Sequence, residues 1–211
     1  MNGPVTLPRV ADTRVDLLLI ADMIPSRSRV LDVGCGEGDL LHVLSTQKDV
    51  DARGIEISQA GVNACVSNGL SVIQGDADID LVDYPDQAFD YVVLSLTLQA
   101  TRNPRRVVEE MVRIGRHAIV SFPNFAFWKI RLQLLTRGQM PETQLLDEPW
   151  WETPNIHLCT IRDFEDLCRD LNLVVEKRVY LNRDGTATWF SSIEQLGNLF
   201  AQQGLFLLRR A

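Results

Sequence analysis

Short apolar runs alternate with amphipathic stretches along most of this chain. In the runs, apolar residues are nearly consecutive, as in strands buried on both faces. In the stretches between them, apolar residues recur every three or four positions, as on one side of a helix. This alternation predicts an α/β fold with a mostly parallel sheet and helices on both of its faces. The runs predict strands over residues 29–34, 51–57, 70–76, 89–96, 117–122, 173–181 and 204–210.

Local capping signals support the helices expected between these strands. Ser58 opens and Gly69 closes one helix, and Pro104 stands at the first position of another that ends before Gly115. Thr160 precedes a third helix over 161–171. The periodicity predicts further helices over 14–24, from Gly38 onward, and over 125–138.

The pattern weakens between residues 123 and 159, which contain four of the nine prolines and three of the four tryptophans. Residues 137–159 form an insertion after the fifth strand, on the side where parallel sheets bind ligands. We expect a lid or a partner surface there, within a single domain spanning 1–211. Trp150 and Trp151 either line a substrate pocket, anchor a partner or pack as part of an ordinary lid.

A glycine-rich turn between the first strand and the next helix is the clearest candidate for chemistry. Gly34, Gly36 and Gly38 let the backbone turn sharply and approach a ligand closely. Their G-x-G-x-G spacing departs from the G-x-G-x-x-G of nicotinamide and flavin sites, because Asp39 stands where the third glycine would fall. A tight turn without a ligand is the alternative.

Acidic residues around this turn indicate the charge of its ligand. Asp32 precedes the turn, Glu37 lies within it and Asp39 follows it. Three carboxylates repel a pyrophosphate but attract a cation. Because S-adenosylmethionine carries a sulfonium and an ammonium group and no phosphate, the turn predicts this ligand rather than NAD.

Two further carboxylates follow the second and third strands. Glu56 lies where a carboxylate can accept both hydroxyls of a ribose. Asp76 lies where it can accept from the exocyclic amine of adenine. Each alone is equally compatible with a solvated acid at a strand end, but the ordered set favours a nucleoside site.

Several of these segments resemble known motifs. VLDVGCGEG, GIEIS, QGDAD and FDYVVLSL resemble, in order, the binding motifs of class I S-adenosylmethionine-dependent methyltransferases over about residues 29–122. DYVVLSLTLQATRNP, IVSFPNFAFWKIRLQLLTRGQMP and TPNIHLCTIRDFEDLC resemble the methionine-biosynthesis protein W (MetW) family, over about residues 14–181.

The resemblance implies a Rossmann-like sheet of seven strands with an antiparallel final hairpin. It also implies a protein of methionine biosynthesis that acts with a homoserine O-acyltransferase, acetyl or succinyl, and supports its activity. The alternative is a methyltransferase that acts on a small molecule. The residues expected to contact S-adenosylmethionine or S-adenosylhomocysteine are Asp32, Gly34, Cys35, Gly36, Glu56, Ile57, Asp76, Ala77 and Ser95.

A base for methyl transfer is harder to identify. Gln99, Asn124 and His157 are the candidates near the fourth and fifth strands, but an amide such as Gln99 cannot act as a base. His157 titrates near neutrality and lies in the insertion. It either acts as the base or holds loop backbone in place, and the second interpretation is favoured.

Composition argues against several classes of function. The formal net charge is -7 and the basic residues are scattered, which disfavours nucleic acid or an anionic membrane as partner. The most basic segment, TRNPRR, is typical of a helix start. No run reaches the roughly 18 apolar residues needed to span a bilayer.

Four cysteines without a CxxC pair predict free thiols in the cytoplasm and no metal site. No GxSxG or GxxxxGK[ST] motif is present, so acyl transfer and P-loop chemistry are not expected from this chain.

Overall fold

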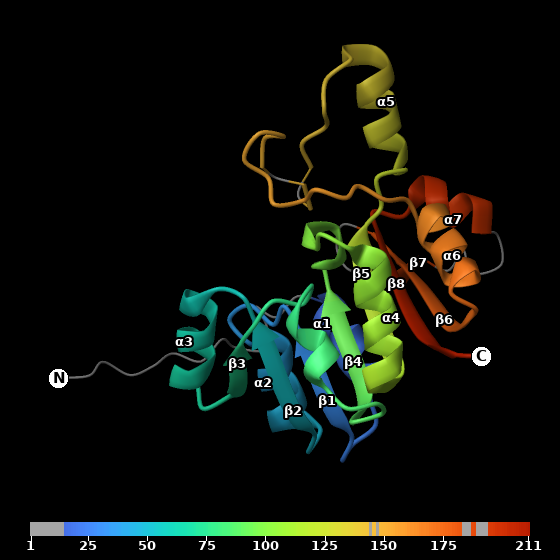
Figure 1. The fold of residues 1–211 in the computed structure, drawn as a ribbon. Coiled ribbons are helices and arrows are strands. Elements are labelled where there is room, and N and C mark those ends of the chain that lie inside the picture. The colour runs from blue at the N-terminus through green and yellow to red at the C-terminus, as the bar shows by residue number, and fades with distance from the viewer. Residues whose placement is uncertain (1–14, 144, 147, 183–186, 189–193) are drawn as a thin grey trace.

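In the computed structural model, eight strands form one sheet with helices on both faces (Figure 1). It describes residues 15–143, 145–146, 148–182, 187–188 and 194–211. The strands are β1 (Arg29–Val33), β2 (Asp51–Glu56), β3 (Ser71–Gln74), β4 (Phe89–Ser95), β5 (Gly115–Pro123), β6 (Leu173–Leu181), β7 (Ala187–Thr188) and β8 (Gln203–Arg210). Seven of them coincide with the predicted strands, and the two-residue β7 is additional.

The strand order is β3-β2-β1-β4-β5-β8-β6-β7. Neighbouring strands from β3 to β5 are parallel, whereas β8 lies between β5 and β6 and is antiparallel to both. The expected antiparallel end of the sheet is therefore confirmed. Because the chain order reverses between β1 and β4, a ligand is expected at the carboxyl ends of these strands.

The helices predicted from periodicity are present with their caps. They are α1 (Val15–Met23), α2 (Asp39–Gln47), α3 (Gln59–Ser67), α4 (Pro104–Ile114), α5 (Trp128–Arg137) and α6 (Ile161–Asp170). The Ser58 side chain accepts from Gly61 at the start of α3, and Thr160 forms a capping box with Asp163 at the start of α6. Three elements were not predicted: η2 (Asp80–Asp83), η3 (Leu98–Ala100) and α7 (Glu194–Phe200).

Alternate residues of the central strands point into two apolar layers. Val92 and Leu94 of β4 face the layer that includes α4 and α6, whereas Val93 faces the layer formed with α1 and α2. In the first layer, the rings of Phe122, Phe164 and Phe206 lie with centroids 4.7 to 5.7 Å apart. Burial on both faces explains why these strands are continuously apolar in sequence.

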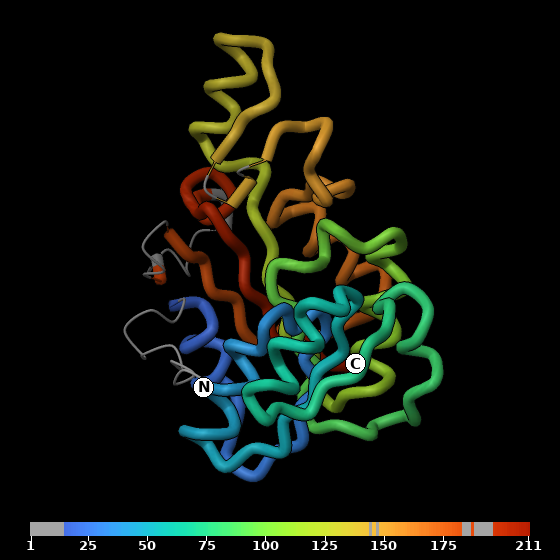
Figure 2. Tube along the Cα trace, turned by 90° about the vertical axis from the view of Figure 1, so that its left-hand side faces the viewer, coloured from blue at the N-terminus to red at the C-terminus, as the bar shows by residue number. Residues whose placement is uncertain are grey.

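The chain between β5 and α6 departs from this layered arrangement. In both views, α5 and the described residues between 138 and 159, together called the projecting unit, extend beyond the carboxyl edge of the sheet (Figures 1 and 2). Ile130 is the buried residue of α5, and it packs in a small cluster with Phe127 and Leu146. The unit thus has a minor core of its own. No helix in the described part of the chain is long and apolar enough to cross a membrane.

Candidate functional site

The glycine turn adopts the backbone conformation that its sequence predicts. Gly34, Gly36 and Gly38 have φ of +70°, +57° and +91°, in the region that favours glycine. The Gly34 N–H donates to the Ile55 carbonyl at 2.8 Å, which fastens the turn to β2. A Cβ on Gly34 would lie 2.8 Å from the Cγ2 atom of Thr97, so the approach of the β4 end requires glycine here.

Glu56 links the glycine turn to the start of α3. Its side chain is buried, its Oε2 accepts the Gly36 N–H at 2.9 Å and its Oε1 accepts the Ser58 N–H at 2.8 Å. In a dinucleotide site, backbone donors of this turn face a phosphate. Here one of them is satisfied by a carboxylate, while each carboxylate oxygen keeps a further lone pair for a ribose hydroxyl.

The turn lies in a negative electrostatic environment. Burial raises the pKa of the Cys35 thiol, and the carboxylates of Asp32 and Glu56 raise it further. Burial also raises the pKa of Cys65, whose thiol donates to the Gly36 carbonyl at 3.3 Å. Asp39 is exposed in the first turn of α2, where an acid also suits the helix dipole. A cationic group is therefore favoured over a phosphate beside this turn.

A cavity of about 150 Å³, called the edge cavity, lies at the carboxyl ends of the central strands. It is lined by Gly34, Ile55, Ile57, Gly75, Asp76, Ala77, Asp78, Thr97, Ala100, Thr101 and Arg102. Ile57 is 64% exposed and offers an apolar surface at its mouth. Ligand pockets usually measure on the order of 300–1,000 Å³, so the edge cavity suits one ring system rather than a whole nucleoside.

Asp76 is engaged by two groups that sequence reasoning did not connect with it. Its Oδ2 forms an ion pair with Arg102, and its Oδ1 accepts the Asp78 N–H at 2.9 Å. Asp78 in turn accepts the backbone N–H groups of Arg102 and Asn103, each at 2.8 Å. Asn103 caps α4, which confirms TRNPRR as a helix start. The sequence carries no local signal for Arg102, because the contact spans more than twenty residues. Adenine recognition by Asp76 stays a prediction.

The end of β4 contains a second feature that the sequence did not indicate. Leu96 has φ of +53°, a conformation that costs on the order of 1–3 kcal/mol for such a residue. Its N–H donates to the Ser121 carbonyl at 3.0 Å, and its carbonyl accepts from the Gln99 amide at 2.6 Å. The neighbouring Ser95 accepts from the Ser121 hydroxyl at 3.3 Å. Backbone strain is thus held where the strand order reverses.

Asn124 serves structure rather than proton transfer. Its amide nitrogen donates to the carbonyls of Asn198 and Ala201, and its amide oxygen accepts the N–H groups of Ala126 and Ile161. Four such bonds, each between 2.8 and 3.4 Å, use the whole side chain to join the chain after β5 to the start of α6 and to the end of α7.

His157 lies where the projecting unit returns to the sheet. Its N–H donates to the Gln99 carbonyl at 2.9 Å, and its ring Nε2 lies 3.3 Å from the Arg102 carbonyl. These contacts agree with the interpretation that His157 holds loop backbone. Gln99 is buried, and its Oε1 has no partner among the described residues. No group of three His, Cys, Asp or Glu in the described part of the chain could hold a metal ion.

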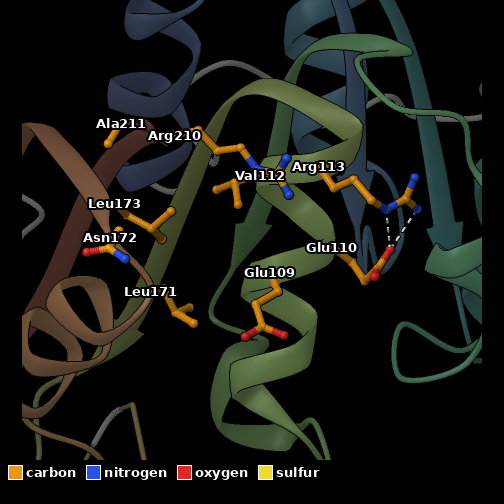
Figure 3. A pocket seen from close by; sticks show the side chains of 9 residues that line it. All are labelled: Glu109, Glu110, Val112, Arg113, Leu171, Asn172, Leu173, Arg210 and Ala211. Atoms are coloured by element: carbon orange, nitrogen blue, oxygen red, sulfur yellow. Dashed lines mark hydrogen bonds and ion pairs between the residues drawn. The ribbon is translucent and has the colours of Figure 1, made fainter.

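A larger cavity of about 540 Å³ lies at the opposite edge of the sheet, beside the end of α4 and the start of β6 (Figure 3). Two of its charged groups, Glu110 and Arg113, have structural roles. Glu110 pairs with Arg113, which also donates to the carbonyls of Tyr84 and Leu81. Since ligands of parallel sheets bind at the carboxyl ends of the strands, the edge cavity is the better candidate site.

Comparisons with known proteins agree with this geometry. The family model described as "Methionine biosynthesis protein MetW" matches residues 14–208. The chain is 36% identical over 203 residues to a bifunctional methionine biosynthesis protein MetXA/MetW of Rhodopirellula baltica. That match covers 86% of this chain and 33% of the relative. The chain spans about a third to a half of the length of the curated relatives that it matches.

Solved structures with the same fold include S-adenosylmethionine-dependent methyltransferases. One from Mesorhizobium loti has a TM-score of 0.68 at 17% identity, covering 94% of this chain and 99% of that one. One from Archaeoglobus fulgidus has a TM-score of 0.67 at 14% identity, covering 92% and 91%. At this identity the likeness shows the fold alone: the class I methyltransferase fold, as expected.

Proposed function

The chain belongs to the MetW family of methionine biosynthesis proteins, and from this premise we propose that it binds S-adenosylmethionine or S-adenosylhomocysteine and supports a homoserine O-acyltransferase. The observation that supports this choice of ligand is the buried Glu56 carboxylate, which accepts a hydrogen bond from the Gly36 N–H at 2.9 Å. A turn whose donor is used in this way, beside Asp32, favours a cationic nucleoside over a dinucleotide.

The residues of the edge cavity and the glycine turn fit such a ligand. Glu56 would accept the ribose hydroxyls, Ile57 would pack on the adenine ring, and Asp76 with Ala77 would flank the edge of the base. Gly34, Cys35 and Gly36 would carry the amino-acid part, close to Asp32 and Ser95. S-adenosylmethionine supplies an electrophilic methyl group on its sulfonium.

The side chains around the edge cavity favour a supporting role over methyl transfer. Its charged residues, Asp76, Asp78 and Arg102, are paired with one another. The ring Nε2 of His157 contacts the carbonyl oxygen of Arg102. An ion-paired or backbone-bound group is poorly placed to remove a proton from a methyl acceptor.

The partner is proposed from the family and from the bifunctional relative. In the Rhodopirellula baltica protein, a MetXA function is named together with MetW in one chain. Both S-adenosylmethionine, which is made from methionine, and the acyltransferase would bind this chain. Binding of one changes the affinity for the other only if a coupling free energy links the two sites. Such a protein would report S-adenosylmethionine levels to the acylation step.

Reconstitution with the homoserine O-acyltransferase of the same organism tests this proposal. The rate of acyl transfer to homoserine is measured with and without the chain, and S-adenosylmethionine is titrated into both reactions. We expect a several-fold higher rate of acyl transfer in the presence of the chain. Adding S-adenosylmethionine should change the apparent affinity of the chain for the acyltransferase, on the order of 5-fold or more. An unchanged rate, together with no binding in calorimetry, contradicts the proposal.

One observation favours a small-molecule methyltransferase as the second candidate. The Gln99 Oε1 is buried without a partner among the described residues, at the carboxyl end of β4. A substrate donor could complete this acceptor. Methyl transfer from labelled S-adenosylmethionine to a metabolite extract, lost in Gln99→Ala and His157→Ala, would support this candidate.

A further inference from the structure

The projecting unit contains an apolar pocket that the described residues leave open. The pocket measures about 410 Å³ and is lined by Phe125, Met140, Pro141, Glu142, Leu146, Glu148, Trp150, Thr153, Asn155, Ile156 and Leu158. Trp150 is 68% exposed, and Trp151 packs edge-on against it with 5.9 Å between the ring centroids. Exposed tryptophans beside an apolar hollow mark an interaction site rather than ordinary surface.

Building on the proposed function, we infer that the apolar pocket is the docking site of the acyltransferase. We further infer that residues 156–158 transmit the state of the edge cavity to it. The occupant is an apolar segment of the partner flanked by lysine or arginine. Of the pocket's lining residues, Glu142 and Glu148 are the charged ones, and both are exposed. A basic flank would pair with them and set the orientation of the partner.

Charge also argues against other occupants. Residues 139–158 contain four acids and no lysine or arginine. Two copies that met through this segment in a symmetric contact would oppose like charges. The same acids repel the anionic surface of a membrane. A methyl acceptor is disfavoured as occupant, because no described residue lines both the apolar pocket and the edge cavity.

The return of the chain at residues 156–158 joins the two sites. Ile156 and Leu158 line the apolar pocket, whereas His157 between them contacts the carbonyls of Gln99 and Arg102. This is the alternation of an extended segment, in which successive side chains point to opposite sides. Arg102 lines the edge cavity. A partner that shifts Ile156 and Leu158 therefore displaces a wall of the edge cavity through His157.

Docking is tested by affinity measurement with the purified acyltransferase. The double variant Met140→Ala/Trp150→Ala removes two exposed lining residues outside 156–158. It should bind about 30-fold more weakly or worse, as expected for a truncated anchor, while its affinity for S-adenosylmethionine alone stays within about twofold. Val66→Ala is the matched control, because it removes an exposed apolar side chain from α3, outside both pockets. Its affinity should be unchanged.

If the double variant does not fold, the surface variant Glu142→Lys/Glu148→Lys replaces it, with an expected loss of about 10-fold or more. Equal binding by wild type and either folded variant overturns the docking site while leaving the proposed function intact. No binding by the wild type overturns the proposed function itself. Loss of a wild-type self-association in Met140→Ala/Trp150→Ala, seen by sedimentation velocity, would instead assign the pocket to a second copy.

Coupling is tested with His157→Ala in a thermodynamic cycle. The affinity for the acyltransferase is measured with and without saturating S-adenosylmethionine, in wild type and variant. We expect the two wild-type affinities to differ about fivefold or more and the two variant affinities to coincide, with docking itself within about threefold of wild type. The same ratio in both proteins overturns the role of residues 156–158.

Discussion

The carboxyl edge of the central strands and the projecting unit are adjacent in space but differ in how completely their side chains are buried and paired within the chain. At the edge, Glu56 and Asp76 are satisfied by backbone donors and by Arg102, and the strands beneath are buried on both faces. In the projecting unit, one residue of α5 is buried and both Trp150 and Trp151 are exposed.

This difference shows which contacts stabilise each region. The edge is completed by contacts within the chain, so its shape exists before any ligand arrives. The projecting unit holds a small core around Ile130, and Trp150 and Trp151 are exposed, which is typical of an interaction surface. Substitutions in the two regions should therefore separate stability from association.

The largest contrast is expected between Phe122→Ala and Trp151→Ala. Phe122 contacts Phe164 and Phe206 in the main apolar layer, so its truncation should lower the free energy of unfolding by about 3–5 kcal/mol. Trp151 is 66% exposed, and its truncation should change that free energy by less than about 0.5 kcal/mol. Urea unfolding followed by circular dichroism measures both. A comparable loss in the two variants would mean that Trp151 has intramolecular contacts that stabilise the fold.

Within α5, Ile130→Ala and Leu135→Ala form a matched pair. Ile130 packs against Phe127 and Leu146, and its loss should cost about 2–3 kcal/mol in the stability of the unit. Leu135 is 84% exposed, and its loss should have no measurable effect. Hydrogen exchange of the α5 amides reports on the unit separately from the sheet. Faster exchange in Leu135→Ala would mean that the Leu135 side chain makes contacts that stabilise α5.

At the edge, Glu56→Ala should have a moderate effect on stability and a large one on binding. Two backbone N–H groups lose their acceptor, which should lower the free energy of unfolding by about 1–3 kcal/mol, and S-adenosylmethionine affinity should fall with it. Glu56→Gln is the control of equal shape, and it keeps one acceptor oxygen. Calorimetry and urea unfolding separate the two losses. Full affinity in Glu56→Ala would remove Glu56 from the ligand site.

At neutral pH the smallest effect is expected from the buried thiols, which act on stability only at high pH. Burial raises the pKa of Cys159 and of Cys168 to about 12, compared with 9.0 for an ordinary thiol. Between these values the unfolded chain loses the thiol protons and the native chain keeps them. Stability is therefore unaffected below pH 9 and falls as the pH rises from about 9 towards 12. Urea unfolding across this range should show a shallower fall in Cys168→Ala, and an identical slope would contradict the burial of this thiol.

Local signals determined much of this fold in advance. Runs of apolar residues predicted the seven strands, and Ser58, Pro104 and Thr160 marked helix starts, because such patterns depend on neighbours within a few residues. The glycine turn and the ordered acids Asp32, Glu56 and Asp76 predicted a candidate site at the carboxyl edge of the sheet, which is where the edge cavity lies.

The tertiary structure alone decided which partner each of these groups has. Glu56 reaches Gly36, Arg102 reaches Asp76, and His157 reaches Gln99 and Arg102 across separations of twenty to more than fifty residues. Periodicity and capping carry no information over such distances. The insertion was predicted as a lid or a partner surface without a choice between them. Its apolar pocket supports the proposal of a partner surface, because only the assembled chain shows which apolar side chains among the described residues stay exposed.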